Sequence, residues 1–296
     1  MPVLLIDCGD AFSSQSKEMD FRKDTSKFIL DAMALMRYDV LNLGVLDLQF
    51  GSEFLEDARK KVSFPFLAAN LRYKDSQPPW AKEYIITEVG GIKIGLLGVV
   101  DPKRLPEFLT PEQQKLLLAI PPEEALNKLV PEVRQKADLV ILLSQFSTTE
   151  LLGLFKSVKG IDLSITAGCR EVVAEMVNPG EMHAPGCGGG GADDQTATGD
   201  IHPDGPVLLY AGPKGMALGK VTIMLDDQGT PQISENQYIT LDNSFSGDEE
   251  MTAKVDGFKK IIEGKEAIIN QQLTNDLQMN PEEFMEQYLK GQKQIN

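Results

Sequence analysis

Short apolar runs alternate with amphipathic stretches along the first two-thirds of the chain. The apolar runs end at glycine or polar residues, which is typical of buried strands. They predict strands over residues 3–7, 38–43, 64–69, 84–89, 92–100, 139–143 and 161–166. Between them, apolar residues recur every three or four positions. That spacing predicts helices over residues 16–36, 51–61, 121–136 and 148–158. Strands that alternate with helices in this way favour a layered α/β domain.

Glycine-rich turns indicate that the predicted sheets contain antiparallel pairs. Gly90 and Gly91 separate two strand patterns, which predicts a β-hairpin. Further strands are predicted over 207–211, 218–225 and 232–241, and helices over 249–273 and 281–290. We therefore expect mixed sheets in a domain of residues 1–247, followed by a helical C-terminal tail or linker of residues 248–296.

Residues 177–205 differ from the rest because they are rich in glycine and proline and have no clear periodicity. This segment contains both histidines of the chain, His183 and His202, together with Cys187. Long irregular segments within compact domains are uncommon and tend to be functional or disordered. The segment is therefore a candidate for functional chemistry.

Composition and charge argue against a nucleic-acid-binding protein and against a membrane-spanning one. The chain has 296 residues and a net charge of −15, which argues against binding to nucleic acid. No apolar run is long enough to predict a membrane span. The first residues enter a predicted strand without a basic stretch, so they do not indicate a signal peptide. The three cysteines are an odd number, which leaves at least one thiol outside any internal disulfide.

Several ordered blocks together resemble a known family. The chain is similar to the 5′-nucleotidase branch of the calcineurin-like metallophosphoesterases over roughly residues 3–265. The matching blocks are LLIDCGD, YDVLNLGVLDLQFG, FPFLAANL, GGIKIGLLGVVD, ADLVILLSQ, GIDLSITAGCRE and GPVLLYAGPKGMALGKVTIMLDDQG. The resemblance implies a four-layer αββα sandwich, in which two mixed sheets pack face to face between outer helices.

The resemblance also implies a chemistry that most of the matching residues do not support. The family uses two metal ions, held by Asp, His and Asn at strand ends, to activate water and to stabilise the phosphoryl transition state. Asp10 matches the carboxylate that bridges the metals. The Asn and His of the Gly-Asn-His-Glu block fall on Val45 and Leu46. The chain contains no counterpart of the first Asp-x-His motif.

The two remaining histidine positions of the family are also changed. The histidine that follows Ser144 is Gln145, and the Gly-His-x-His block falls on residues 167–171, which contain no histidine. Both histidines of the chain lie outside the matching blocks. We therefore expect a pseudoenzyme on a hydrolase fold, and no two-metal hydrolysis.

Cysteines and histidines stand near the positions that lost their ligands. Cys8 precedes Asp10 on the first strand, and Cys169 lies at the former Gly-His-x-His block, beside Arg170. In the implied fold both strand ends point to one cleft, from which the segment with His183, Cys187 and His202 departs. The sequence thus predicts a cluster with the candidate catalytic residues Cys8, Cys169, Arg170 and Cys187, and the candidate metal ligands Asp10, His183 and His202.

Several uses of this cluster remain open. One is thiol–disulfide chemistry, with Arg170 favouring a thiolate. Another is a single transition metal, zinc or copper. A third is a static disulfide from Cys187 to Cys8 or Cys169. In the plainest alternative, the cysteines are core residues and the histidines polar loop residues.

Broader alternatives concern the function of the whole chain. They are a residual nucleotide or phosphoester hydrolase, and a structural partner of an attached or associated electron-transfer, cytochrome-like domain. The chain has no Cys-x-x-Cys-His motif, so we expect no haem within it. The resemblance further implies an extracytoplasmic or periplasmic location.

Overall fold

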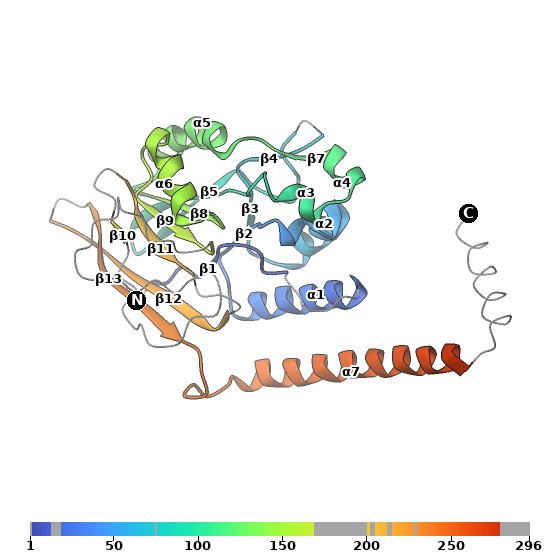
Figure 1. Cartoon of the computed structure of the whole chain (residues 1–296). Helices are drawn as coiled ribbons and strands as arrows, with labels where there is room; N and C mark the ends of the chain where they lie inside the picture. The colour runs from blue at the N-terminus through green and yellow to red at the C-terminus, as the bar shows by residue number, and fades with distance from the viewer. Residues whose placement is uncertain are drawn as a thin grey trace. The chain divides into compact units, whose positions relative to one another are not determined.

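The structure of the chain, a computed structural model, describes residues 2–12, 19–74, 76–168, 200–201, 205–211, 215–227 and 230–278 (Figure 1). The predicted helix at 281–290 lies outside these residues. The chain divides into two compact units, Met1–Phe245 and Ser246–Asn296. The predicted domain boundary after residue 247 stays a prediction. No helix of the described part is long and apolar enough to cross a membrane.

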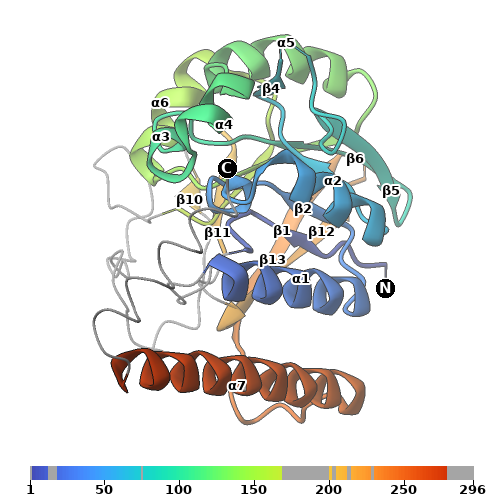
Figure 2. The ribbon, with the colours of Figure 1, turned by 90° about the vertical axis from the view of Figure 1, so that its right-hand side faces the viewer.

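A small parallel sheet begins the first unit. Its strands, in spatial order, are β1 (Ile6–Asp7), β2 (Val40–Asn42) and β3 (Phe66–Leu67). Two helices pack on its outer face, α1 (Met19–Leu35) and α2 (Gly51–Lys61) (Figure 2). The sheet therefore has one face toward these helices and one toward the rest of the unit.

A larger mixed sheet forms the other half of the unit. In spatial order its strands are β10 (Asp200–Ile201), β11 (Val207–Tyr210), β9 (Leu163–Thr166), β8 (Leu139–Ser144), β6 (Ile92–Gly98) and β5 (Tyr84–Val89). The four inner strands are parallel, and β5 and β10 are antiparallel to their neighbours. Helices α5 (Pro122–Arg134) and α6 (Thr148–Ser157) cover the outer face.

The buried residues show how the layers stack. Successive residues of a strand point to opposite faces of a sheet. Leu96 accordingly packs between the two sheets with Val40 and Leu67, whereas Leu97 packs beneath α5 with Leu126. The order of layers is helices, sheet, sheet, helices. The predicted mixed α/β sandwich is confirmed.

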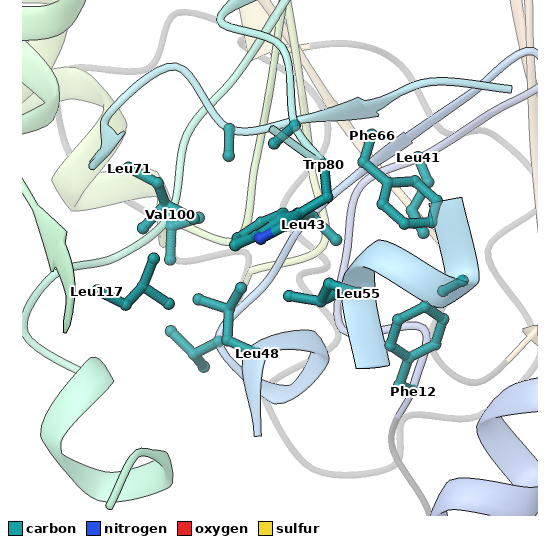
Figure 3. Packing of buried hydrophobic residues seen from close by; sticks show 14 of the residues in the cluster. Phe12, Leu41, Leu43, Leu48, Leu55, Phe66, Leu71, Trp80, Val100 and Leu117 are labelled. Atoms are coloured by element: carbon teal, nitrogen blue, oxygen red, sulfur yellow. The ribbon is translucent and has the colours of Figure 1, made fainter. Parts of the chain in front are cut away.

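The outer core of the small sheet is centred on an aromatic side chain. Trp80 is 2% exposed and lies among Leu43, Leu48 and Leu55 in Figure 3. Burial of large apolar side chains of this kind contributes about 1.5–3 kcal/mol each to folding. This cluster includes residues of the loop after β2, and that loop forms part of the strand-end edge described below.

Short elements between residues 71 and 119 are missing from the predicted set. They are β4 (Leu71–Tyr73), α3 (Leu105–Phe108), α4 (Pro111–Leu116) and β7 (Leu117–Ala119). Earlier in the chain, a 3₁₀ turn at Leu46–Leu48 was not predicted either. β4 and β7 pair antiparallel. Strands of three residues carry too few positions for a periodic pattern to stand out.

Two further elements complete the described part. The hairpin of β12 (Ala217–Leu225) and β13 (Pro231–Thr240) has a register shift between Thr222 and Ile223. Its residues Val221, Ile223 and Ile233 pack against the core between the sheets. In the second unit, α7 (Glu249–Gln278) is a single long helix.

Candidate functional site at the strand ends

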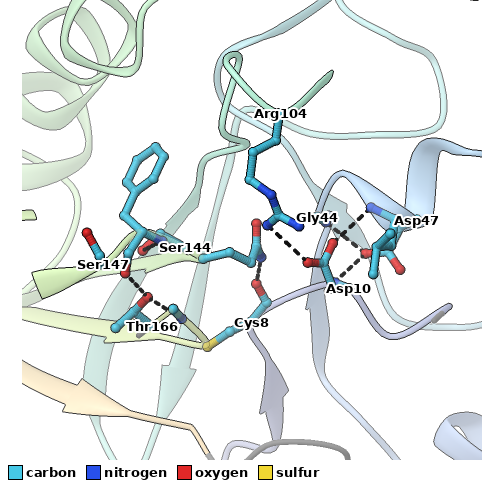
Figure 4. Close-up of polar contacts among 12 residues, drawn as sticks. Cys8, Asp10, Gly44, Asp47, Arg104, Ser144, Ser147 and Thr166 are labelled. Carbon is cyan, nitrogen blue, oxygen red and sulfur yellow. Dashed lines mark hydrogen bonds and ion pairs between the residues drawn. The ribbon is translucent and has the colours of Figure 1, made fainter. Parts of the chain in front are cut away.

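The carboxyl ends of β1, β2, β6, β8 and β9 meet at one edge of the sandwich (Figure 4). Side chains in the loops that follow these strands converge there, as is usual for α/β folds. The residues that form this strand-end edge are Cys8, Asp10, Gly44, Asp47, Arg104, Gln145, Thr166 and Gly168.

Asp10 lies at the end of β1 in a backbone conformation that few residues adopt. Its φ is 61°, and Gly9 before it has a φ of 105°. One carboxylate oxygen, Oδ1, accepts a hydrogen bond of 2.9 Å from the backbone N–H of Leu46. The other, Oδ2, lies 3.6 Å from Nη1 of Arg104. Burial raises the pKa of Asp10, and the Leu46 amide and Arg104 act in the opposite direction. Both oxygens of this carboxylate are thus engaged by the protein itself.

Asp47 is completely buried and accepts hydrogen bonds from the loops around it. Its Oδ2 accepts from the backbone N–H of Gly44 at 2.7 Å and of Asp10 at 2.8 Å. Its Oδ1 accepts from the N–H of Phe12 at 2.8 Å. Burial, and next the charge of Asp10, raise the pKa of Asp47 well above its ordinary value, and the hydrogen bonds from Gly44 and Phe12 oppose this. Asp47 ties the loop after β1 to the loop after β2.

Sequence reasoning missed Asp47, although a signal was present. Asp47 directly follows Val45 and Leu46, so it falls on the acidic position of the Gly-Asn-His-Glu block. The block ends in Glu, and Asp47 is likewise acidic, whereas the two positions before it hold the aliphatic Val45 and Leu46. Its contacts with backbone amides explain why a carboxylate suits this position without any metal.

Gln145 and Asn42 link the two sheets through one backbone carbonyl. The side-chain amide of Gln145 donates a hydrogen bond to the carbonyl oxygen of Cys8. Nδ2 of Asn42 donates to the same oxygen at 2.9 Å, and to the carbonyl of Val99 at 3.4 Å. Gln145 follows β8 in the large sheet, whereas Cys8 follows β1 in the small sheet. Gln145, which the resemblance aligns with a histidine, therefore joins the sheets.

Cys8 has the surroundings of a core residue. It is 4% exposed, its Sγ donates to the carbonyl of Ile165 at 3.6 Å, and it forms no disulfide with another described residue. Burial, and next the charge of Asp7, raise the pKa of the Cys8 thiol. Reactive cysteines have a lowered pKa and some exposure. Of the interpretations left open by the sequence, these surroundings favour that of a core residue for Cys8.

Gly168 ends the described part of the strand-end edge in a tightly packed turn. Its backbone N–H donates to Oγ1 of Thr166 at 2.9 Å, and that hydroxyl donates to the carbonyl of Phe146 at 2.7 Å. A Cβ atom at Gly168 would lie 2.1 Å from the carbonyl oxygen of Phe146. Glycine is therefore required here for close approach of two backbone segments.

The other predicted site residues, namely Cys169, Arg170, His183, Cys187 and His202, lie outside the described residues. Their convergence with Cys8 or Asp10, and their roles in redox chemistry or metal binding, stay predictions.

The described residues do not fit a pair of metal ions. Divalent ions in proteins need several oxygen, nitrogen or sulfur ligands around one point. Asp10 is the carboxylate at the matching position, but the neighbouring ligand positions hold the aliphatic Val45 and Leu46. In the described part of the chain, no group of three or more His, Cys, Asp or Glu side chains has an arrangement that could hold a metal.

The chain is similar to known proteins in sequence and in fold. No family model matches it. A snake venom 5′-nucleotidase from Crotalus adamanteus is 26% identical over 262 residues, which cover 87% of this chain and 43% of that protein. The chain spans less than half the length of the curated relatives it matches.

Two solved structures share the fold. The 5′-nucleotidase precursor from Thermus thermophilus has a TM-score of 0.69 at 18% identity, covering 88% of this chain and 50% of its own. The calcineurin-like phosphoesterase YfkN from Bacillus subtilis has a TM-score of 0.63 at 18% identity, covering 87% of this chain and 83% of its own. At these identities the structures support the same layered fold and nothing finer.

Proposed function

We propose that this chain, which belongs with the 5′-nucleotidases and calcineurin-like phosphoesterases by sequence and fold, is a non-hydrolytic member of that group. In this proposal it keeps the phosphoesterase sandwich as a stable module for binding or assembly. Hydrolysis by a pair of metal ions is lost.

One observation carries the proposal, namely that the polar groups left at the strand-end edge bind one another. Asp10 accepts from Leu46 and faces Arg104, and the Gln145 amide donates to the Cys8 carbonyl. A two-metal site needs carboxylate, imidazole and amide groups that are free to turn toward the ions. Here the groups that remain are used for hydrogen bonds and an ion pair, which supports a structural role for the edge.

Phosphate release by the purified chain tests the proposal. Nucleoside 5′-monophosphates, 2′,3′-cyclic nucleotides and p-nitrophenyl phosphate are assayed with Mn²⁺, Zn²⁺, Mg²⁺ or Ca²⁺, and Asp10→Ala is the matched control. We expect the wild-type rate to equal that of the control with every ion. Metal-dependent release that disappears in Asp10→Ala would overturn the proposal.

A variant with restored ligands provides a positive comparison. Val45→Asn, Leu46→His and Gln145→His together return the side chains that the family resemblance implies at those positions. We expect this triple variant to retain more Mn²⁺ than the wild type in equilibrium dialysis. Equal retention of Mn²⁺ by both proteins would show that more than these ligands was lost.

The thiol-redox and soft-metal hypotheses rest on residues outside the described part. For Cys169, Cys187, His183 and His202 they stay predictions, tested by thiol titration with mass mapping and by metal analysis. An electron-transfer partner likewise stays a prediction. Because the relatives include snake venom enzymes, we extend the proposal to an extracytoplasmic location.

A further inference from the structure

We propose that Arg104 is the resident cation of the strand-end edge, and that its guanidinium takes the place beside Asp10 that a metal ion would occupy in an active relative. This inference rests on the proposed function, because it takes the strand-end edge to work without a pair of metal ions. Arg104 was not among the candidate site residues predicted from the sequence. In this proposal it positions the Asp10 carboxylate.

The position of Arg104 is set by its loop. Arg104 precedes the first residue of α3, and its backbone N–H donates to the carbonyl of Asp101 at 3.3 Å. The guanidinium carbon lies 5.5 Å from the centre of the Phe108 ring, one turn along α3. Arginine stacks on aromatic rings and keeps its charge in such a setting. The side chain is thus supported on one side by a ring and faces Asp10 on the other.

The charges around Asp10 give this cation a clear effect. Asp7 and Asp47 are two further carboxylates close enough to interact with each other and with Asp10. Like charges in a partly buried cluster repel one another, and a cation nearby offsets that repulsion. In the ion pair, the Asp10 side chain is 20% exposed and the Arg104 side chain 37% exposed. The pair is therefore only partly screened by water.

A divalent ion and a guanidinium can each offset the repulsion between the carboxylates around Asp10. A divalent ion needs several ligands around it. The positive charge of Arg104 is covalently attached to the chain and needs only Asp10 as a partner. Loss of the ligands at Val45, Leu46 and Gln145 is compatible with Arg104 but not with a metal. The pairing of Arg104 with Asp10 therefore explains both why Asp10 is retained and why the ligands at Val45, Leu46 and Gln145 are not needed.

A double-mutant cycle tests the pairing. Urea unfolding is measured for the wild type, Arg104→Met, Asp10→Asn and the double variant, because Asn can still accept the hydrogen bond from Leu46. We expect Arg104→Met to raise the unfolding equilibrium constant roughly fivefold in the wild-type background. In the Asp10→Asn background it should have no effect. Equal effects in both backgrounds would refute the pairing.

Two further variants separate charge from packing. Arg104→Lys keeps the charge and should recover part of the lost stability, whereas a purely structural role of the side chain predicts no recovery. Lys103→Met is the matched control, because Lys103 is adjacent, 78% exposed and paired with Glu150. It should leave the unfolding equilibrium unchanged. A loss equal to that of Arg104→Met would contradict a specific role for Arg104.

Manganese tests the replacement itself. Arg104→Met is added to the triple variant Val45→Asn, Leu46→His, Gln145→His, and we expect the resulting protein to retain more Mn²⁺ in equilibrium dialysis than the triple variant with Arg104 in place. Equal retention of Mn²⁺ by these two proteins would overturn the replacement. These outcomes differ from a failure of the proposed function, which is detected by metal-dependent phosphate release from the wild type.

Discussion

Replacement of Asp7 by Asn should make the protein more stable at neutral pH and change its stability much less at pH 4. Asp7 ends β1, and its Oδ1 accepts a hydrogen bond of 2.8 Å from the backbone N–H of Gly9. Burial, and to a lesser extent the charge of Asp10, raise the pKa of Asp7 from 3.8 to about 6. An Asn side chain can accept the same bond without carrying a charge.

The sign and the size of the effect follow from this pKa. A carboxyl group whose pKa is raised in the folded state stabilises the protein below its unfolded pKa, near 4, and this contribution is lost as the pH rises through about 6. One pKa unit corresponds to about 1.36 kcal/mol, so Asp7 costs the wild type up to about 3 kcal/mol at pH 7.5. Asp7→Asn removes that cost.

The assay is urea unfolding of the wild type and Asp7→Asn between pH 4 and pH 7.5. Trp80, the single tryptophan of the chain, is 2% exposed and reports unfolding by its fluorescence. Asp57→Asn, on the exposed face of α2, is the control for removal of an acidic residue. If Asp7→Asn is no more stable than the wild type at pH 7.5, or differs from it equally at both ends of the range, the reasoning about Asp7 is wrong.

Four other predictions concern packing and hydrogen bonding in the first unit. Gly168→Ala should destabilise the fold by about 1–3 kcal/mol, because its Cβ would lie 2.1 Å from the carbonyl oxygen of Phe146. Gly153→Ala in α6, where no atom lies within 4 Å of the new Cβ, should stabilise by about 1 kcal/mol in the same urea assay. Asn70→Ala should cost about 3 kcal/mol, since its amide makes three hydrogen bonds of 2.9–3.0 Å with the backbone, and an unchanged urea midpoint would contradict this. The Cys8 thiol should resist alkylation until urea unfolds the chain, and mass mapping that finds rapid labelling of Cys8 in the folded protein would show that its burial is incomplete.

The regular elements were predictable from local patterns. The helix expected over residues 51–61 is α2 with the same bounds, because its apolar positions and charged face are strongly periodic. The hairpin around Gly90 and Gly91 was equally clear, since glycine allows the positive φ of 62° and 84° found there. Residues 101–120 were not predictable, because α3, α4 and β7 are short and depend on contacts with distant segments.

The strand-end edge was predictable in position but not in contacts. The ordered blocks of the sequence indicated that Asp10 and Gln145 would stand at strand ends. They did not indicate that Arg104 would face Asp10, since the two residues are far apart in the chain and the arginine lies in a loop without periodicity. Nor did they indicate that Gln145 would donate to the carbonyl of Cys8. A side-chain amide can bind any backbone carbonyl, so the sequence does not identify its partner.

Retention of Asp10 is not in itself a sign of metal binding. A residue with a φ of 61° is in the left-handed region, where Asp and Asn are enriched several-fold over other residues with a side chain. The same carboxylate accepts the N–H of Leu46 and faces Arg104, while the backbone N–H of Asp10 donates to Asp47. Backbone conformation, hydrogen bonding and charge each favour aspartate at this position without a metal. A carboxylate at this position therefore does not by itself indicate hydrolysis, and under the proposed function the aliphatic Val45 and Leu46 stand where neighbouring ligands would be needed.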